Sequence, residues 1–209
     1  MHLLLLGATG LVGGHVLTQA LADPNVTAIT APTRRPLPTN PRLSAPMVDF
    51  DNLPQDPALW AADVVICALG TTLKAAGSRE RFYLIDHDFT LGIARLAKAH
   101  GARIFILNSA KGADPKSPVF YSRVKGETER DIQALGFQRT VLVRPGLIDG
   151  PRGEPRPFEQ WAGRILAVLK PVLPRSMQAN RPERIARAML AAAWSSEPGV
   201  TVVASQDLL

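Results

Sequence analysis

Three side chains in the middle of the sequence are of kinds that can move a proton at a substrate oxygen. Tyr121 and Lys125 stand four residues apart, so on a helix they share one face. A phenol ordinarily has a pKa of about 10, and a neighbouring ammonium favours its ionised form. Tyr121 is therefore a candidate acid or base, with Lys125 beside it to bind a ribose; the alternative is a solvated helix surface. Ser109 is a candidate to hold the substrate oxygen.

A glycine-rich loop near the start of the chain predicts a seat for a diphosphate. The apolar run at 3–6 leads into glycines spaced G-x-x-G-x-x-G, and an apolar pattern at helical spacing follows. A strand, a glycine loop and a helix N-terminus in this order offer free N–H groups to an anion, although the same loop can pack a helix on a strand without any ligand. The expected dinucleotide contacts are Gly7, Ala8, Thr9, Gly10, Leu11, Val12 and Gly13.

Two arginines stand where a site selective for NAD would place a carboxylate. That carboxylate normally lies about 20 residues past the glycine loop and binds the ribose 2′-hydroxyl. Arg34 and Arg35 follow the second expected strand instead, and a guanidinium suits a phosphate, so we expect NADP(H) in preference to NAD(H). A solvated arginine pair is the alternative. Position after the third and fourth expected strands adds Asp49, Phe50, Leu69, Gly70 and Thr71 as cofactor contacts.

Strand and helix patterns alternate along the chain, and they must position these residues. The expected strands are 3–6, 26–30, 44–48, 63–68, 103–107, 140–143 and 200–203, and the expected later helices are 79–100, 119–135 and 158–169. Strands separated by helices need crossover connections, so the fold class is α/β, a doubly wound parallel sheet of the Rossmann type. We expect one domain over 1–209, with a small C-terminal cap region in which the proline-rich segment 150–182 is a substrate-side insertion.

Composition bounds the class of protein. The chain has 209 residues, a formal net charge of +6 and one cysteine, Cys67, within an apolar run. Neither a secretion signal nor a membrane span is recognisable, so a cytoplasmic protein is expected. The histidines lack metal-ligand spacing, and no metal is expected; Asp86, His87 and Asp88 are interpreted as a solvated helix face.

The positive charge is confined to one segment. Between 139 and 187 there are ten basic and four acidic residues, and the rest of the chain balances. The segment is either a solvated surface or a basic rim for an anionic substrate, a partner or a membrane surface. No recognition helix is present, so nucleic acid is not an expected partner. The expected partner is a small-molecule substrate, and monomer and homodimer both stay open.

The motifs together resemble the short-chain dehydrogenase/reductase superfamily, in its atypical or extended branch. The glycine loop, the Tyr121/Lys125 pair and the R-P-G turn at 144–146 match in order. The segments A-L-G-T-T at 68–72, K-A-A-G-S at 74–78, S-A-K-G-A at 109–113 and F-Y-S-R-V-K-G-E at 120–127 look like the HIV Tat-interacting-protein-like NAD(P)H-binding oxidoreductases. The resemblance implies that the tyrosine is the acid/base, the lysine binds ribose and the serine orients the substrate.

One departure from the family keeps three hypotheses open. The family often has two adjacent serines at the strand end, whereas this chain has Ser109 followed by Ala110, with Ser117 and Ser122 as weaker substitutes. The first hypothesis is an NADP(H)-dependent oxidoreductase acting on a carbonyl or alcohol carbon. The second is an NADPH-binding regulatory or sensor protein with little turnover. The third is an enzyme like the nucleotide-sugar epimerases.

Overall fold

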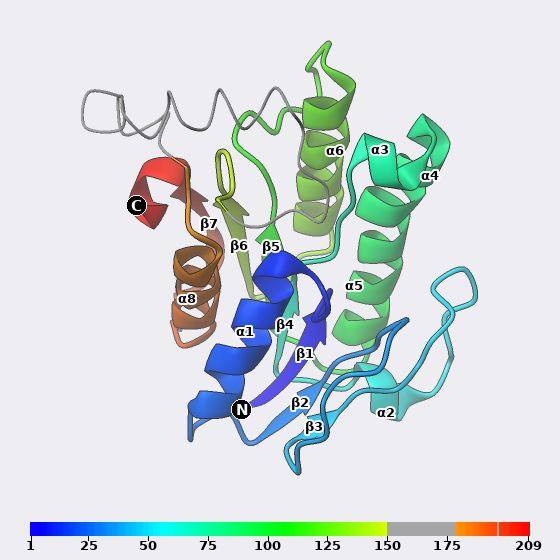
Figure 1. Cartoon of the computed structure of the whole chain (residues 1–209), viewed down its shortest axis with the longest axis vertical. Coiled ribbons are helices and arrows are strands. Elements are labelled where there is room, and N and C mark those ends of the chain that lie inside the picture. Colours follow the sequence, from blue (N-terminus) through cyan, green and yellow to red (C-terminus); the bar gives the residue numbers. More distant parts are fainter. Residues whose placement is uncertain (150–178, 196) are drawn as a thin grey trace.

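The computed structural model describes residues 1–149, 179–195 and 197–209. Its centre is one seven-stranded sheet in the order β3-β2-β1-β4-β5-β6-β7, and every pairing is parallel (Figure 1). The strands are β1 (His2–Leu6), β2 (Ala28–Thr30), β3 (Leu43–Ser44), β4 (Val64–Cys67), β5 (Ile104–Asn108), β6 (Arg139–Arg144) and β7 (Gly199–Ala204). The predicted doubly wound α/β fold is confirmed.

Helices cover both faces of the sheet (Figure 1). They are α1 (Leu11–Ala22), α2 (Pro57–Trp60), α3 (Leu73–Ala76), α4 (Arg79–Tyr83), the π-helix η1 (Leu84–Asp88), α5 (Phe89–Ala99), α6 (Phe120–Ala134), α8 (Pro182–Ala193) and the 3₁₀-helix η3 (Ser205–Leu208). The expected helix at 158–169 and most of the expected insertion at 150–182 lie outside the described residues.

The leucine run of β1 is fully buried because it serves two hydrophobic cores. Side chains of a strand alternate between the two faces of the sheet. Leu3 and Leu5 pack with residues of α1 and α8, while Leu4 and Leu6 pack with residues of α5 and α6. A strand that is covered on both faces has no solvent-exposed positions, so its sequence is an unbroken apolar run rather than an alternation of apolar and polar residues.

The third strand is shorter than predicted. The sequence favours 44–48, but β3 covers only Leu43–Ser44. Pro46 has no N–H to donate to a ladder, and beyond it the pairing with the chain after β2 continues only as an isolated bridge between Thr33 and Met47. The pairing still places the residues after Met47 beside those after Thr33.

The long helix predicted at 79–100 is divided by a π-helix. It consists of α4, η1 and α5 in succession, and the wider turn of η1 contains Asp86 and His87. The side-chain oxygen of Thr128 on α6 lies 3.4 Å from the carbonyl oxygen of Asp86 and 2.8 Å from that of Val124. A π turn shifts every later side chain around the helix axis, and such turns are frequent at functional sites.

Asn180 joins the two chain ends that flank the undescribed segment 150–178. Its backbone pairs with Leu147 and Asp149, and its side chain is fully buried. The carboxamide oxygen accepts hydrogen bonds from the Gly146 N–H (2.7 Å) and the Ser205 hydroxyl (2.8 Å), while its amide donates to the Ser205 carbonyl (2.8 Å). This side chain therefore holds the turn after β6 to the start of η3.

Replacing Asn180 by Ala should destabilise the protein by about 1–3 kcal/mol, because buried hydrogen-bonding groups lose their partner. The free energy of unfolding from urea denaturation measures this. The matched control is Asn52→Ala, which removes an exposed carboxamide bonded to Asp49 at 3.2 Å. Equal stability of the Asn180 and Asn52 variants would show that the buried carboxamide contributes nothing.

Candidate cofactor and active site

The glycine loop after β1 has the close backbone packing of a phosphate cradle. Gly7 has a φ of 80°, and a Cβ there would stand 2.5 Å from the carbonyl oxygen of Ala68. A Cβ on Gly13 would stand 2.0 Å from the carbonyl oxygen of Gly7. Any side chain at either position would force the loop away from β4 or from α1. Gly10, the N-cap of α1, and Leu11, its first residue, are exposed, so this end of the helix is accessible at the surface.

The other loop residues divide between the core and the surface. Ala8 and Val12 are 3% and 6% exposed and pack into the core on the α1 face. They can therefore offer a ligand only their backbone. Thr9 is half-buried and Leu11 is 37% exposed, so their side chains remain accessible. The cradle, empty of side chains at Gly7 and Gly13, fits a diphosphate by its shape and by the N–H groups of α1.

Arg34 and Arg35, which follow β2, lie near the glycine loop. Arg35 donates from Nη2 to the carbonyl oxygen of Thr9 at 3.0 Å, which places its guanidinium against the glycine loop. Its backbone is fixed by the Thr33 hydroxyl, which accepts from the Arg35 N–H. Arg34 is exposed and lines a neighbouring cavity of about 380 Å³.

That cavity unites residues from three separate segments. Its lining is Arg34, Met47, Val48, Asp49, Phe50, Asp51, Arg81 and Phe89. Asp49 and Phe50, predicted from position alone, are thus brought together with Arg34. The Arg81 guanidinium on α4 binds the Asp51 carboxylate at 2.7 and 3.1 Å, and its hydrogen bonds hold the pKa of Asp51 below the ordinary value. The lining has two guanidinium groups and two carboxylates, and Arg81 is paired with Asp51, so Arg34 is the group that could meet an anionic substituent on an adenosine held against the apolar wall.

The chain after β4 passes directly over a buried ion pair. A Cβ on Gly70 would lie 3.3 Å from Oδ1 of Asp86 and 3.6 Å from Nζ of Lys125. The Thr71 N–H donates to Oδ2 of Asp86 at 2.9 Å. The segment 69–71 therefore lies between the glycine loop and the Lys125 ammonium. A dinucleotide that reached from the loop to Lys125 would pass over this segment.

Lys125 is a buried cation with a defined counter-charge. Its Nζ lies 2.6 Å from Oδ1 of Asp86, and the two side chains are 9% and 0% exposed. Burial is the largest single influence and lowers the pKa of this ammonium, but the Asp86 carboxylate, with a smaller contribution from Tyr121, more than compensates, so the pKa of Lys125 is raised above its ordinary value. Lys125 is consequently a permanent positive charge at neutral pH.

Tyr121 stands one helical turn before Lys125 on α6 and is accessible. Its side chain is 39% exposed, and its ring centroid is 5.8 Å from that of the buried Phe82 on α4. The aromatic contact orients the ring, while the phenol remains open to solvent or to a ligand. The predicted Tyr121/Lys125 pair thus lies on one helix at the carboxyl edge of the sheet, near Gly70 and Asp86.

Ser109 is less accessible than its predicted role requires. It is 4% exposed, and its hydroxyl is buried without a hydrogen-bond partner among the described residues. Its backbone N–H is held by the carbonyl oxygen of Val143 at 2.7 Å. Ala110, the next residue, is 6% exposed. The structure therefore places Ser109 at the correct strand end but does not present its hydroxyl at an open surface.

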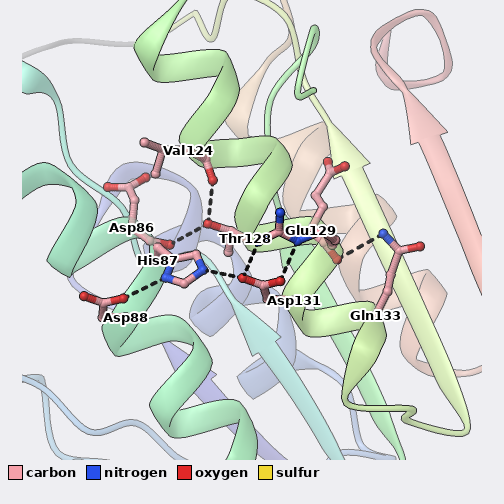
Figure 2. Close-up of polar contacts among 9 residues, drawn as sticks. Asp86, His87, Asp88, Val124, Thr128, Glu129, Asp131 and Gln133 are labelled. Carbon is pink, nitrogen blue, oxygen red and sulfur yellow. Dashed lines mark hydrogen bonds and ion pairs between the residues drawn. The ribbon is translucent and has the colours of Figure 1, made fainter. Parts of the chain in front are cut away.

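The interpretation of Asp86, His87 and Asp88 as a solvated face is wrong for Asp86 and His87, whereas the Asp88 side chain is 49% exposed, as that interpretation expects. Asp86 and His87 are 2% and 6% exposed. Figure 2 shows the His87 ring between two carboxylates: Nδ1 lies 2.7 Å from Asp88 and Nε2 lies 2.9 Å from Asp131 on α6. Hydrogen bonds from Arg130 and His87 lower the pKa of Asp131 to about 2. Within the wider turn of η1, Asp86 and His87 face α6, where they contact Lys125 and Asp131.

Asp86 is the residue of the site that sequence reasoning missed. A signal existed, because Phe82, Asp86 and Ile93 recur at roughly helical spacing and the two apolar members are fully buried. A carboxylate in the apolar stripe of a helix needs a partner, and a buried lysine is the natural one. The prediction for Asp86 was wrong because it followed the adjacent polar residues His87 and Asp88 rather than the buried residues at helical spacing.

The basic segment 139–187 only partly forms a surface. Arg139 is 6% exposed, and Arg144 is bound at 2.5 and 2.9 Å to the buried Glu129 carboxylate. Arg181, Arg184 and Arg187 are exposed, and the other five basic residues of the segment lie outside the described part of the chain. Among the described residues, no cluster of three or more His, Cys, Asp or Glu could hold a metal, and no helix is long and apolar enough to cross a membrane.

Comparison with curated proteins identifies relatives over most of the chain. Protein fmp52 of Emericella nidulans is 44% identical over 168 residues, which cover 76% of this chain and 71% of the relative. Protein FMP52 of Candida albicans is 37% identical over 163 residues, covering 74% and 70%. Both are named mitochondrial, which contradicts the prediction of a cytoplasmic protein.

Comparison with solved structures shows the same fold. MoeE5, solved with UDP-glucose and NAD, superposes with a TM-score of 0.75 at 19% identity, covering 98% of this chain and 75% of that one. A short chain dehydrogenase family protein from Francisella tularensis superposes with a TM-score of 0.67 at 12% identity, covering 99% and 98%. A family model described as NAD(P)H-binding matches residues 7–162. Because that model matches most of the chain and the curated relatives are this similar, the chain belongs to the NAD(P)H-binding family.

Proposed function

We propose that the protein is an NADP(H)-dependent oxidoreductase that interconverts a carbonyl and an alcohol, with Tyr121 as the acid/base. The observation that carries the proposal is the buried Lys125 cation beside Gly70, one helical turn from the exposed Tyr121. A permanent ammonium at this edge of the sheet can hydrogen-bond a ribose and favour the ionised form of a nearby phenol.

The roles of the residues follow from their positions. The glycine loop and α1 would hold the diphosphate, Arg34 and Arg35 a 2′-phosphate, and Asp49 and Phe50 the adenosine. When bound, the dinucleotide supplies or accepts the hydride. In the reducing direction Tyr121 donates its phenolic proton to the carbonyl oxygen as the carbonyl carbon gains the hydride, and it regains a proton from solvent. In the oxidising direction the ionised phenol removes the proton of the alcohol.

The direct test is oxidation of NADPH by the purified chain with a panel of aldehydes and ketones. Measurable turnover that requires the carbonyl compound is the expected result. If NADPH binds and no carbonyl or alcohol in the panel reacts, the oxidoreductase assignment fails while cofactor binding stands.

The preference for NADP(H) makes a separate prediction at Arg34 and Arg35. Replacing both by Ser should raise the dissociation constant for NADPH about tenfold or more and change that for NADH little, because the guanidinium groups would meet only the extra phosphate. Titration calorimetry with both cofactors measures this. Arg184→Ser, at an exposed position of α8, is the control. Equal losses for the two cofactors would remove the basis for the preference.

A second candidate is a cofactor-binding regulator with little turnover. The buried hydroxyl of Ser109 and the methyl group of Ala110 at the next position favour it, because neither offers a donor to a developing oxyanion. In that case partner capture from an extract should differ between the NADPH-loaded and the unloaded chain. The same capture in both states would exclude this function.

A third candidate is an enzyme like the nucleotide-sugar epimerases. It is favoured by solved relatives such as the UDP-glucuronic acid 4-epimerase of Bacillus cereus, which superposes with a TM-score of 0.70 at 16% identity. This chain covers 78% of that protein. Conversion of UDP-glucose or UDP-glucuronic acid by the purified chain would support this candidate, and the absence of both binding and conversion would exclude it.

A further inference from the structure

A second cavity, of about 320 Å³, lies at the amino-terminal edge of the sheet. Asp63 and Arg103, which line it, immediately precede β4 and β5, and Arg139 is the first residue of β6. The glycine loop follows the carboxyl end of β1. In a parallel sheet these are opposite edges, so this cavity is separate from the candidate cofactor site.

Arg139, which lines this cavity, has a buried guanidinium group whose hydrogen bonds are incomplete among the described residues. The residue is 6% exposed, and its Nη1 donates to the carbonyl oxygen of Glu197 at 2.5 Å. Its Nε is buried and has no hydrogen-bond partner, and no carboxylate is paired with it, in the part of the chain that the structure describes. A buried guanidinium without a counter-ion is costly, and an anion in the cavity would relieve that cost.

The charges around the cavity favour an anion of single charge. Arg103 is exposed and adds a second guanidinium, while the Asp63 carboxylate, which accepts from the His2 N–H at 2.8 Å, offsets one of these two positive charges. The ammonium of Met1, also in the lining, donates instead to the Asn25 carbonyl oxygen at 3.0 Å and to the Thr27 hydroxyl at 3.3 Å. A multiply charged phosphate would leave negative charge beside Asp63. A carboxylate matches both the remaining single charge and the forked geometry of a guanidinium.

The rest of the lining indicates a flat apolar body on that anion. Trp194, the C-cap of α8, lines the cavity and is 45% exposed. Val64, Ile104 and Ala193, which belong to or pack against the hydrophobic core, line the same cavity. An exposed indole face beside aliphatic groups favours an aromatic ring. We infer that the cavity between the amino ends of β4, β5 and β6 and the end of α8 is a binding site for a small aromatic monocarboxylate.

The test is titration calorimetry of the full chain with 2-naphthoate, an aromatic monoanion, with and without saturating NADPH. Binding of 2-naphthoate is expected in both conditions. The affinity for 2-naphthamide, the neutral analogue, should be lower by at least about tenfold. Because the readout is binding at the far edge of the sheet, it does not depend on turnover or on the proposed function.

Variants at exposed lining residues avoid the risk of unfolding that Arg139 carries. Arg103→Glu and Gln138→Glu should each weaken 2-naphthoate binding at least about tenfold, because they add negative charge at the cavity. Arg184→Glu makes the same charge change as Arg103→Glu near the other end of α8 and should leave binding unchanged. The inference is overturned if 2-naphthoate does not bind, if the amide binds equally well, or if Tyr121→Phe rather than Arg103→Glu abolishes binding.

Discussion

Replacing Tyr121 by Phe is expected to lower kcat by about 10²- to 10⁴-fold and to leave the affinity for NADPH nearly unchanged. Phenylalanine keeps the ring contact with Phe82, at 5.8 Å between centroids, and removes only the hydroxyl group. The Lys125–Asp86 ion pair, at 2.6 Å, does not involve that hydroxyl and should persist. The change therefore separates proton transfer from cofactor binding.

Steady-state rates and calorimetric NADPH titration of the same preparations measure the two effects. Tyr83→Phe is the matched control, since Tyr83 is the other tyrosine of the chain. It is the last residue of α4, and its ring lies 4.6 Å from that of His87. That variant should keep near-normal turnover. Loss of NADPH binding with retained turnover in Tyr121→Phe would refute the assignment of the acid/base, as would equal losses of rate in both variants.

The sheet was predictable because its signals are local. Leu3 to Leu6 form an unbroken apolar run, and the glycines that follow occupy the positions where a Cβ would collide with Ala68 or with Gly7 itself. The strand predicted at 44–48 ends at Ser44 because Pro46 has no N–H and interrupts the ladder of hydrogen bonds. Helix α8 was not predicted, although Ile185, Met189 and Leu190 repeat at helical spacing. It directly follows the proline-rich segment, and prolines argue against a helix.

The site was predictable only where a residue's role follows from its place after a strand. Arg34, Asp49 and Phe50 meet in one cavity for that reason. Asp86 lies instead in the π turn, where its carbonyl group contacts α6 through the Thr128 hydroxyl, and this tertiary contact is not visible in the local sequence pattern. The same turn buries His87 between Asp88 and Asp131 (Figure 2). Accessibility of Ser109 is likewise a tertiary property, set by packing around the end of β5.

Replacing Asp86 by Asn should destabilise the protein by about 3–5 kcal/mol at neutral pH, because it leaves the Lys125 ammonium buried without its counter-charge. Asn preserves the shape, and its carboxamide oxygen can still accept from the Thr71 N–H, so the effect is mainly electrostatic. Urea denaturation at about pH 7 measures it. Asp51→Asn, which breaks the exposed pair with Arg81, is the control and should change stability little.

The pH dependence of that loss has a definite sign. In the wild type, Asp86 raises the pKa of Lys125 above its unfolded value, so the pair stabilises the fold below the unfolded pKa of about 10.4 and loses this contribution as pH rises through the folded pKa. In the variant the Asp86 charge is lost, and burial, the largest single influence, is opposed only by weaker ones such as Tyr121. The pKa of Lys125 therefore falls from its wild-type position, so the stability lost is largest below about pH 10.4 and smaller above it. The stability gap between the two proteins should therefore be largest near neutrality and shrink in alkaline solution. A gap that stays constant between about pH 7 and pH 11 would show that Asp86 acts through packing and hydrogen bonds rather than through the charge of Lys125.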